Sequence, residues 1–93
     1  MFKKKADPRI PEEKKQIIFQ RIKPIIAKEL GIDENSVTIA SRLVEDLGAD
    51  SLDSIEITIG LEDEFNIEIL DEDGEKMKIV DDIVVYLAER VKE

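Results

Sequence analysis

Apolar residues recur at helical spacing in three separate stretches of this 93-residue chain, and no other feature restricts the possible folds as strongly. The clearest stripe lies near the C-terminus and consists of Val80, Ile83, Val84, Leu87 and Val91. Residues three and four apart share one face of a helix, so this segment is expected to bury that face against other helices. The pattern predicts an all-α fold.

The first apolar stretch is expected to form a helix that begins at Pro11 and stops at Gly31. Its apolar residues are Ile18, Ile22, Ile25, Ile26 and Leu30. Pro11 suits the first position of a helix, where its missing N–H costs nothing, and Gly31 suits the stop. Pro24 lies inside the pattern and would remove the bond to the Gln20 carbonyl, so we predict a kink or break near residues 20–24.

The middle stretch fits a helix over its whole length but a strand over a short part. Residues 55–59 alternate between isoleucine and polar residues, which is typical of a strand. Over the longer window two stripes at helical spacing appear: Ile57, Leu61 and Phe65 in one, and Leu52, Ile55 and Ile59 in the other. We therefore predict a helix that has Asp50 as its N-cap and ends near Asn66.

Two further segments complete the predicted architecture. A series of apolar residues should hold residues 32–50 against the core, and a short helical turn is expected from Ser41 onward. That series is Val37, Ile39, Leu43, Val44 and Leu47. Residues 71–76 are acidic and are expected to form a short turn or helix. The sum is a four-helix bundle of three longer helices and one short one, with a long loop between the first and second helices.

Length and composition bound the class of protein. We expect one domain over residues 11–93, preceded by a flexible basic tail at residues 1–10. With 14 basic and 23 acidic residues the net charge is −9, which opposes nucleic acid and favours basic partners. The chain has no cysteine and no stretch of the roughly 18 apolar residues that a membrane span requires. We expect a cytoplasmic monomer.

Ser51 is the residue that the sequence singles out for chemistry, because it lies between Asp50 and Asp53 at an expected helix start. The chain has no histidine to act as its base, so a classical Ser-His-Asp triad is excluded, and Ala49 and Asp53 stand where a nucleophile elbow needs glycines. A helix N-terminus does tolerate a phosphate group. Ser51 is therefore interpreted as a site of modification by another protein, and the competing interpretation is a first-turn or capping serine.

An acidic run around Gly74 invites a calcium-loop interpretation, which fails on the spacing. If Gly74 occupied the sixth loop position, Ile69 would be first and Val80 twelfth, and neither offers a ligand oxygen from its side chain. We predict no metal site.

The stretch from Leu43 to Phe65 closely resembles the bacterial acyl carrier proteins of fatty-acid synthesis, above all in VEDLGADSLDS at residues 44–54. A looser resemblance extends from about Gln16 to Val91. The resemblance implies a carrier rather than an enzyme. Ser51 would receive 4′-phosphopantetheine from coenzyme A through a separate magnesium-dependent phosphopantetheinyl transferase, and the thiol of that group would bear fatty acyl chains as thioesters without any protein cysteine.

The resemblance also implies that the second helix docks onto acyl-processing enzymes with basic patches. Its acidic residues would meet their Arg and Lys side chains around an exposed apolar stripe. The implied docking residues are Asp50, Leu52, Asp53, Ile55, Glu56, Ile59, Glu62 and Asp63. Two alternatives stay open: a carrier for aminoacyl or other specialised chains, and an unmodified acidic helical interaction module in which Ser51 is only a cap.

Overall fold

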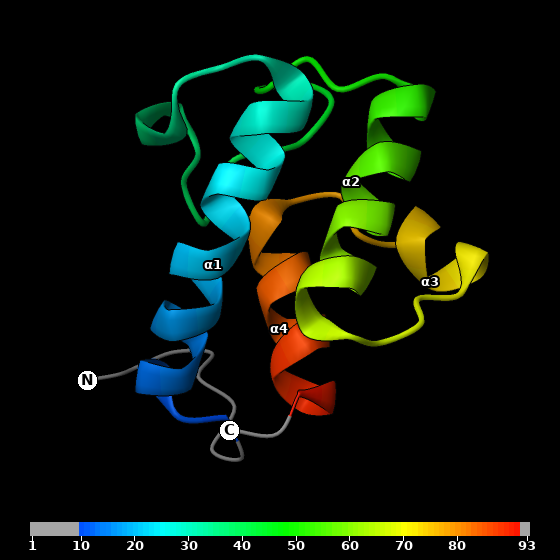
Figure 1. Ribbon diagram of the computed structural model, residues 1–93. Coiled ribbons are helices and arrows are strands. Elements are labelled where there is room, and N and C mark those ends of the chain that lie inside the picture. Colours follow the sequence, from blue (N-terminus) through cyan, green and yellow to red (C-terminus); the bar gives the residue numbers. More distant parts are fainter. Residues whose placement is uncertain (1–9, 92–93) are drawn as a thin grey trace.

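The computed structural model describes residues 10–91, so residues 1–9 of the predicted tail lie outside the described range. Its helices are α1 (Glu12–Leu30), the 3-10 turn η1 (Glu34–Ser36), α2 (Ser51–Phe65), α3 (Asp71–Glu75) and α4 (Val80–Arg90). In Figure 1, α1 runs up the page, α2 and α4 run down it, and α3 lies on the side of α2 away from α1. The predicted bundle of three longer helices and one short one is confirmed.

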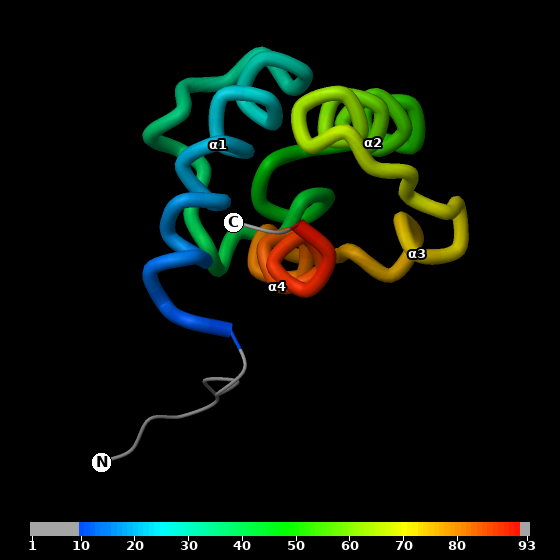
Figure 2. The backbone as a smooth tube through the Cα atoms, turned by 60° about the horizontal axis from the view of Figure 1, so that its bottom comes forward, coloured from blue at the N-terminus to red at the C-terminus, as the bar shows by residue number. Residues whose placement is uncertain are grey.

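The three longer helices share one apolar core, in which α1 packs against both α2 and α4 (Figure 2). The fully buried large side chains are Ile18, Ile22, Ile26, Leu61, Val80, Ile83, Val84 and Leu87. All eight belong to the predicted helical stripes, of which Ile25, Leu30 and Val91 are only partly buried. Full burial of each such side chain contributes about 1.5–3 kcal/mol. The stripes therefore account for the way the three helices face one another.

The ends of α1 follow the predicted signals closely. Pro11 is the N-cap rather than the first helical residue, and Gly31 takes the left-handed conformation (φ 67°) that ends the helix. The Ile32 N–H donates to the Ala27 carbonyl across this turn (3.0 Å). Ile10 is only 7% exposed and belongs to the core, so the compact part of the chain includes residue 10, which was predicted to lie in the tail.

Of the kink or break predicted near residues 20–24, the break is wrong, because α1 continues through Pro24. Pro24 and Gln20, whose carbonyl loses its usual helical donor, are both exposed, so water can reach that carbonyl. An interior proline costs about 3 kcal/mol. The buried apolar face of α1 extends on both sides of Pro24 and offsets this cost.

Most of the apolar series in the long loop faces the core, as predicted. Val37 and Leu43 are buried, and Ile39 and Leu47 pack against the core from its edge. Val44 is the exception, with 59% of its surface exposed. Leu43 and Val44 are consecutive in a turn, so the burial of Leu43 directs its neighbour outward.

Gly60 lies on the face of α2 that packs closely against α1. A Cβ atom at this position would lie 2.9 Å from Ile25 Cγ2, which is too close for carbon atoms. Cγ2 is bonded directly to the Ile25 Cβ, and χ1 of a β-branched residue in a helix is stiff, so the methyl group can move only with the helix. The absence of a side chain at residue 60 therefore sets the α1–α2 spacing.

We expect Gly60→Ala to lower the free energy of unfolding by about 1 kcal/mol. Overpacking costs about 1–3 kcal/mol, and the higher helix propensity of alanine relative to glycine offsets about 1 kcal/mol of that cost. Urea titration measures the change. In an Ile25→Ala background the clash is absent, so the same substitution should become stabilising there. Equal effects of Gly60→Ala in the two backgrounds would contradict this explanation.

Candidate functional site

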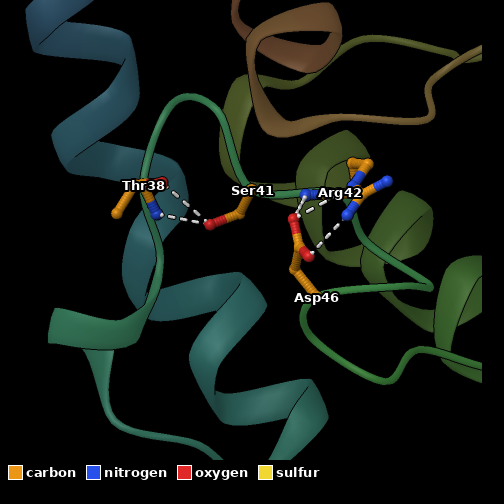
Figure 3. Close-up of polar contacts among 4 residues, drawn as sticks. All are labelled: Thr38, Ser41, Arg42 and Asp46. Carbon is orange, nitrogen blue, oxygen red and sulfur yellow. Dashed lines mark hydrogen bonds and ion pairs between the residues drawn. The ribbon is translucent and has the colours of Figure 1, made fainter.

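The loop that leads to Ser51 is stabilised by side-chain contacts (Figure 3). The buried Ser41 Oγ accepts a bond from the Thr38 N–H (3.0 Å) and lies 2.9 Å from Thr38 Oγ1. Asp46 accepts bonds from the backbone N–H and the guanidinium of Arg42, at 2.8–3.2 Å. The side-chain bond from Arg42, followed by the backbone bond, lowers the pKa of Asp46 below its ordinary value. Residues 43–47 do form a turn after Ser41, but no helix lies there, so the predicted helical turn is confirmed only as a turn.

This loop is also joined to the start of α4 through backbone hydrogen bonds. The N–H groups of Val80 and Asp81 donate to the carbonyls of Ser41 (2.9 Å) and Ile39 (3.0 Å), and the Leu43 N–H donates to the Lys78 carbonyl (3.0 Å). The N-cap of α4 is Ile79, which provides no side-chain cap. The loop carbonyls therefore accept hydrogen bonds from N–H groups in the first turn of α4 that have no partner within the helix. The same bonds hold the loop in place against α4.

A tight turn then directs the chain into α2. Gly48 has a φ of 77°, in the left-handed region that favours glycine. The next residue, Ala49, is buried, and its N–H donates to the Leu43 carbonyl (2.9 Å). Ser51 follows two residues later, so its position is determined by a loop that is anchored to the core and to α4.

The N-terminus of α2 is closed by a reciprocal pair of hydrogen bonds. The Asp53 N–H donates to Asp50 Oδ1 (2.8 Å), and the Asp50 N–H donates to Asp53 Oδ2 (3.1 Å). This confirms the predicted N-cap, Asp50, and the end of the helix at Asn66 is also as predicted. Ser51 is the first helical residue and is exposed, and its hydroxyl bonds to no other residue in the described part of the chain.

The two apolar stripes of α2 lie on different faces. Ile57, Leu61 and Phe65 are buried. Leu52, Ile55 and Ile59 are 61%, 57% and 51% exposed. The strand interpretation of residues 55–59 is therefore wrong, because the longer helical pattern buries one complete stripe against α1.

The acidic residues of α2 do not all have the same environment. Asp50, Glu56 and Asp63 are exposed, whereas Asp53 is partly buried and takes part in the cap. Glu62 is also partly buried, and its Oε2 accepts a bond from the Ile69 N–H (2.8 Å). Three of these carboxylates, those of Asp50, Asp53 and Glu62, therefore accept hydrogen bonds from backbone N–H groups, and the sequence predicted this only for Asp50.

Glu56 lies beside Glu29, at the C-terminal end of α1. A hydrogen bond with the Glu29 carboxyl, followed by the negative charge of that group, raises the pKa of Glu56 above its ordinary value of 4.5. Asp53 and Asp50 act in the same direction, more weakly. The N-terminal half of α2 therefore carries a concentrated negative charge at neutral pH.

We expect Glu56→Gln to stabilise the fold at pH 7 and to lose this advantage in acid. A carboxyl whose pKa is raised on folding stabilises the folded chain only at low pH, and this contribution is lost as the pH rises through the folded-state pKa. The amide removes the repulsion, so the melting temperatures of variant and wild type should differ at pH 7 and converge below pH 4.5. Asp63→Asn controls for net charge. A difference that does not change with pH would contradict the explanation.

A groove of about 870 Å³ opens beside Ser51 and continues between α2 and α3. Its apolar lining consists of Leu43, Val44, Ile55, Ile59, Ile69, Leu70 and Met77. Glu62, Glu75 and Lys78 line its edges. The sequence did not indicate Leu70 or Met77 as groove residues, and the exposed side chains of Val44 and Leu70 both belong to this lining.

Residues 10–91 contain neither a membrane-spanning helix nor a cluster of metal ligands. None of the helices there has the length and apolar character of a membrane span. The same residues contain no group of three or more acidic side chains arranged to hold a metal ion.

A model of the family described as "phosphopantetheine attachment site" matches residues 20–73, a region that includes the long loop, all of α2 and the start of α3. Domains of this family hold a 4′-phosphopantetheine group and act as carriers rather than enzymes. An exposed serine beside a long apolar groove fits that group. Because the match covers more than half of the chain, the protein belongs to the family of phosphopantetheine attachment domains.

Proposed function

We propose that Ser51 is the attachment residue and that the protein carries fatty acyl chains in fatty-acid biosynthesis or a related acyl-transfer pathway. One observation carries this proposal: the exposed hydroxyl of Ser51 opens onto the groove of about 870 Å³. The other three serines are less suitable, because Ser41 is buried, Ser36 lies in η1 away from the groove lining, and Ser54, which also lines the groove, is half-buried.

The surroundings of Ser51 suit a phosphodiester. Asp50 already caps the N–H of Asp53, and the N–H groups of Ser51 and Leu52, in the first turn of α2, have no acceptor within the helix and are available to an added phosphate. The positive end of the helix dipole offsets the repulsion from Asp50 and Asp53. In this proposal the transferase supplies the magnesium ion and the base that removes the serine proton, and the chain itself has no histidine for that task.

The groove is the proposed place for the acyl chain. When bound, the prosthetic group supplies the thiol that forms the thioester, and the chain's own residues then shield the acyl part from water. Ile55 and Ile59 from α2 face Ile69 and Leu70 from the connection to α3 across this space. Apolar side chains on both walls favour a hydrocarbon chain over an amino acid.

The exposed side of α2 is the proposed docking surface for the transferase and for acyl-processing enzymes in the cytoplasm. Asp50, Glu56 and Asp63 offer exposed negative charge, and Leu52 with Ile55 offers apolar area between them. Exposed charges steer and orient a basic partner more than they add affinity, which suits brief contacts with many enzymes.

Loading of the purified protein tests this function. Incubation with coenzyme A, magnesium and a phosphopantetheinyl transferase should add the mass of one phosphopantetheinyl group, and a chelator should prevent the addition. A fatty-acyl ligase should then charge the thiol, whereas amino-acid ligases should not. An unchanged mass would refute the attachment, and charging by an amino-acid ligase alone would refute the fatty-acid assignment.

A further inference from the structure

Glu62 belongs to the acidic series of α2, but its carboxylate is directed toward the backbone of the next segment. Its Oε2 accepts the hydrogen bond from the Ile69 N–H at 2.8 Å, across seven residues of sequence. The side chain is partly buried and lines the groove. A carboxylate held in this way is less available to a basic partner than its exposed neighbour Asp63.

The bond from Glu62 lies at the point where the chain turns from α2 into α3. Ile69 is buried, Leu70 is exposed, and both line the groove opposite Ile59. Leu70 is also the N-cap of α3, and its carbonyl accepts the N–H groups of Asp73 and Gly74 (3.0 Å each). The bond therefore holds in place the segment of Ile69 and Leu70, which forms one wall of the groove and leads into α3.

Few other contacts fix α3. It has five residues, packs mainly against α2, and is joined to α4 by the bond from the Tyr86 hydroxyl to Asp73 Oδ2 (2.9 Å). A helix of this length has little stability of its own, so its position depends on such anchors. Loss of the hydrogen bond from the Ile69 N–H to Glu62 should therefore free the α2–α3 connection to move without unfolding the core.

We propose that Glu62 is a positioning residue, which holds the α2–α3 wall of the groove closed over the thioester through the Ile69 N–H. This inference rests on the proposed function, since the thioester is the cargo that the wall protects. It reassigns Glu62 from the docking surface to the groove. The hydrogen bond, rather than the negative charge, is the property that matters.

Two substitutions separate the bond from the charge. Glu62→Gln keeps an acceptor oxygen at the same reach and removes the charge. Glu62→Asp keeps the charge but shortens the side chain by one methylene, which carries its oxygens out of reach of the Ile69 N–H. If Glu62 acts by docking, Glu62→Gln should impair its function, because the negative charge is lost. If Glu62 positions the α2–α3 wall, Glu62→Asp should impair its function, because the hydrogen bond is lost. Asp63→Asn is the matched control on the neighbouring exposed carboxylate.

The first measurement is amide hydrogen exchange at Ile69 in the unloaded protein. Loss of the bond in Glu62→Asp should speed this exchange about tenfold. Glu62→Gln should stay within about threefold of wild type, because a neutral acceptor is weaker than a charged one but still present. Exchange at Leu61 in the core reports on global stability and should change in neither variant. Equal exchange at Ile69 in all variants would overturn the proposal.

The second measurement is cleavage of a thioester. A phosphopantetheinyl transferase and octanoyl-CoA load each variant with the octanoyl arm, and hydroxylamine then cleaves it while mass spectrometry follows the loss. Cleavage should be several-fold faster in Glu62→Asp and unchanged in Glu62→Gln and Asp63→Asn. Faster exchange at Ile69 with unchanged cleavage would overturn the role in protection. Failure of every chain to load would instead refute the proposed function, and the exchange result would stand on its own.

Discussion

Ser51→Ala should remain entirely at its unmodified mass after incubation with coenzyme A, magnesium and a phosphopantetheinyl transferase. The substitution removes the one exposed hydroxyl at the start of α2, and Asp50 rather than Ser51 caps that helix. The variant should therefore fold normally, with a free energy of unfolding within about 0.5 kcal/mol of wild type. Circular dichroism checks the fold, and intact mass checks the loading.

Ser54→Ala is the matched control for that result. It removes a second hydroxyl only three residues later on the same helix. Ser54 forms its hydrogen bonds through its backbone, since its N–H donates to the Asp50 carbonyl (3.0 Å) and its carbonyl accepts the Thr58 hydroxyl (2.9 Å). The control should gain one group as wild type does. Loading of the Ser51→Ala chain, or failure of the Ser54→Ala chain, would place the attachment elsewhere.

Leu61→Ala should have the largest effect on stability. Leu61 is 1% exposed and lies where α2 faces the core. Removal of its buried methyl groups leaves a cavity and should cost about 3 kcal/mol, which for a domain of this size lowers the melting temperature by roughly 15 °C. Thermal unfolding followed by circular dichroism measures the shift.

Ile59→Ala provides the comparison within the same helix. Ile59 is 51% exposed, and alanine has the higher helix propensity, so the melting temperature should change little. A loss as large as that of Leu61→Ala would mean that the two stripes of α2 do not divide into an inner and an outer face.

The α2 helix illustrates what the sequence could predict. The segment at residues 55–59 favours a strand by its local pattern, and only the longer stripe that ends at Phe65 indicates a helix. The structure follows the longer pattern, because burial of a whole stripe against α1 outweighs the preference of single residues. The N-cap at Asp50 and the end at Asn66 were predictable because both depend on local chemistry.

The errors of prediction share a different cause. Continuity of α1 at Pro24 depends on which face is exposed, and the outward position of Val44 depends on the burial of its neighbour. The bond from Glu62 to the Ile69 N–H depends on how the α2–α3 connection folds back. Each of these three features depends on how the chain packs in three dimensions. Periodicity and residue type do not reveal that packing.

The central claim is that Ser51 carries the prosthetic group, and fragmentation mass spectrometry of the loaded wild-type chain tests it most directly. The chain has four serines, so the fragments must separate Ser51 from Ser36, Ser41 and Ser54. We predict that the whole added mass lies on fragments that contain Ser51 and end before Ser54. Added mass on a fragment that lacks Ser51 would contradict the account.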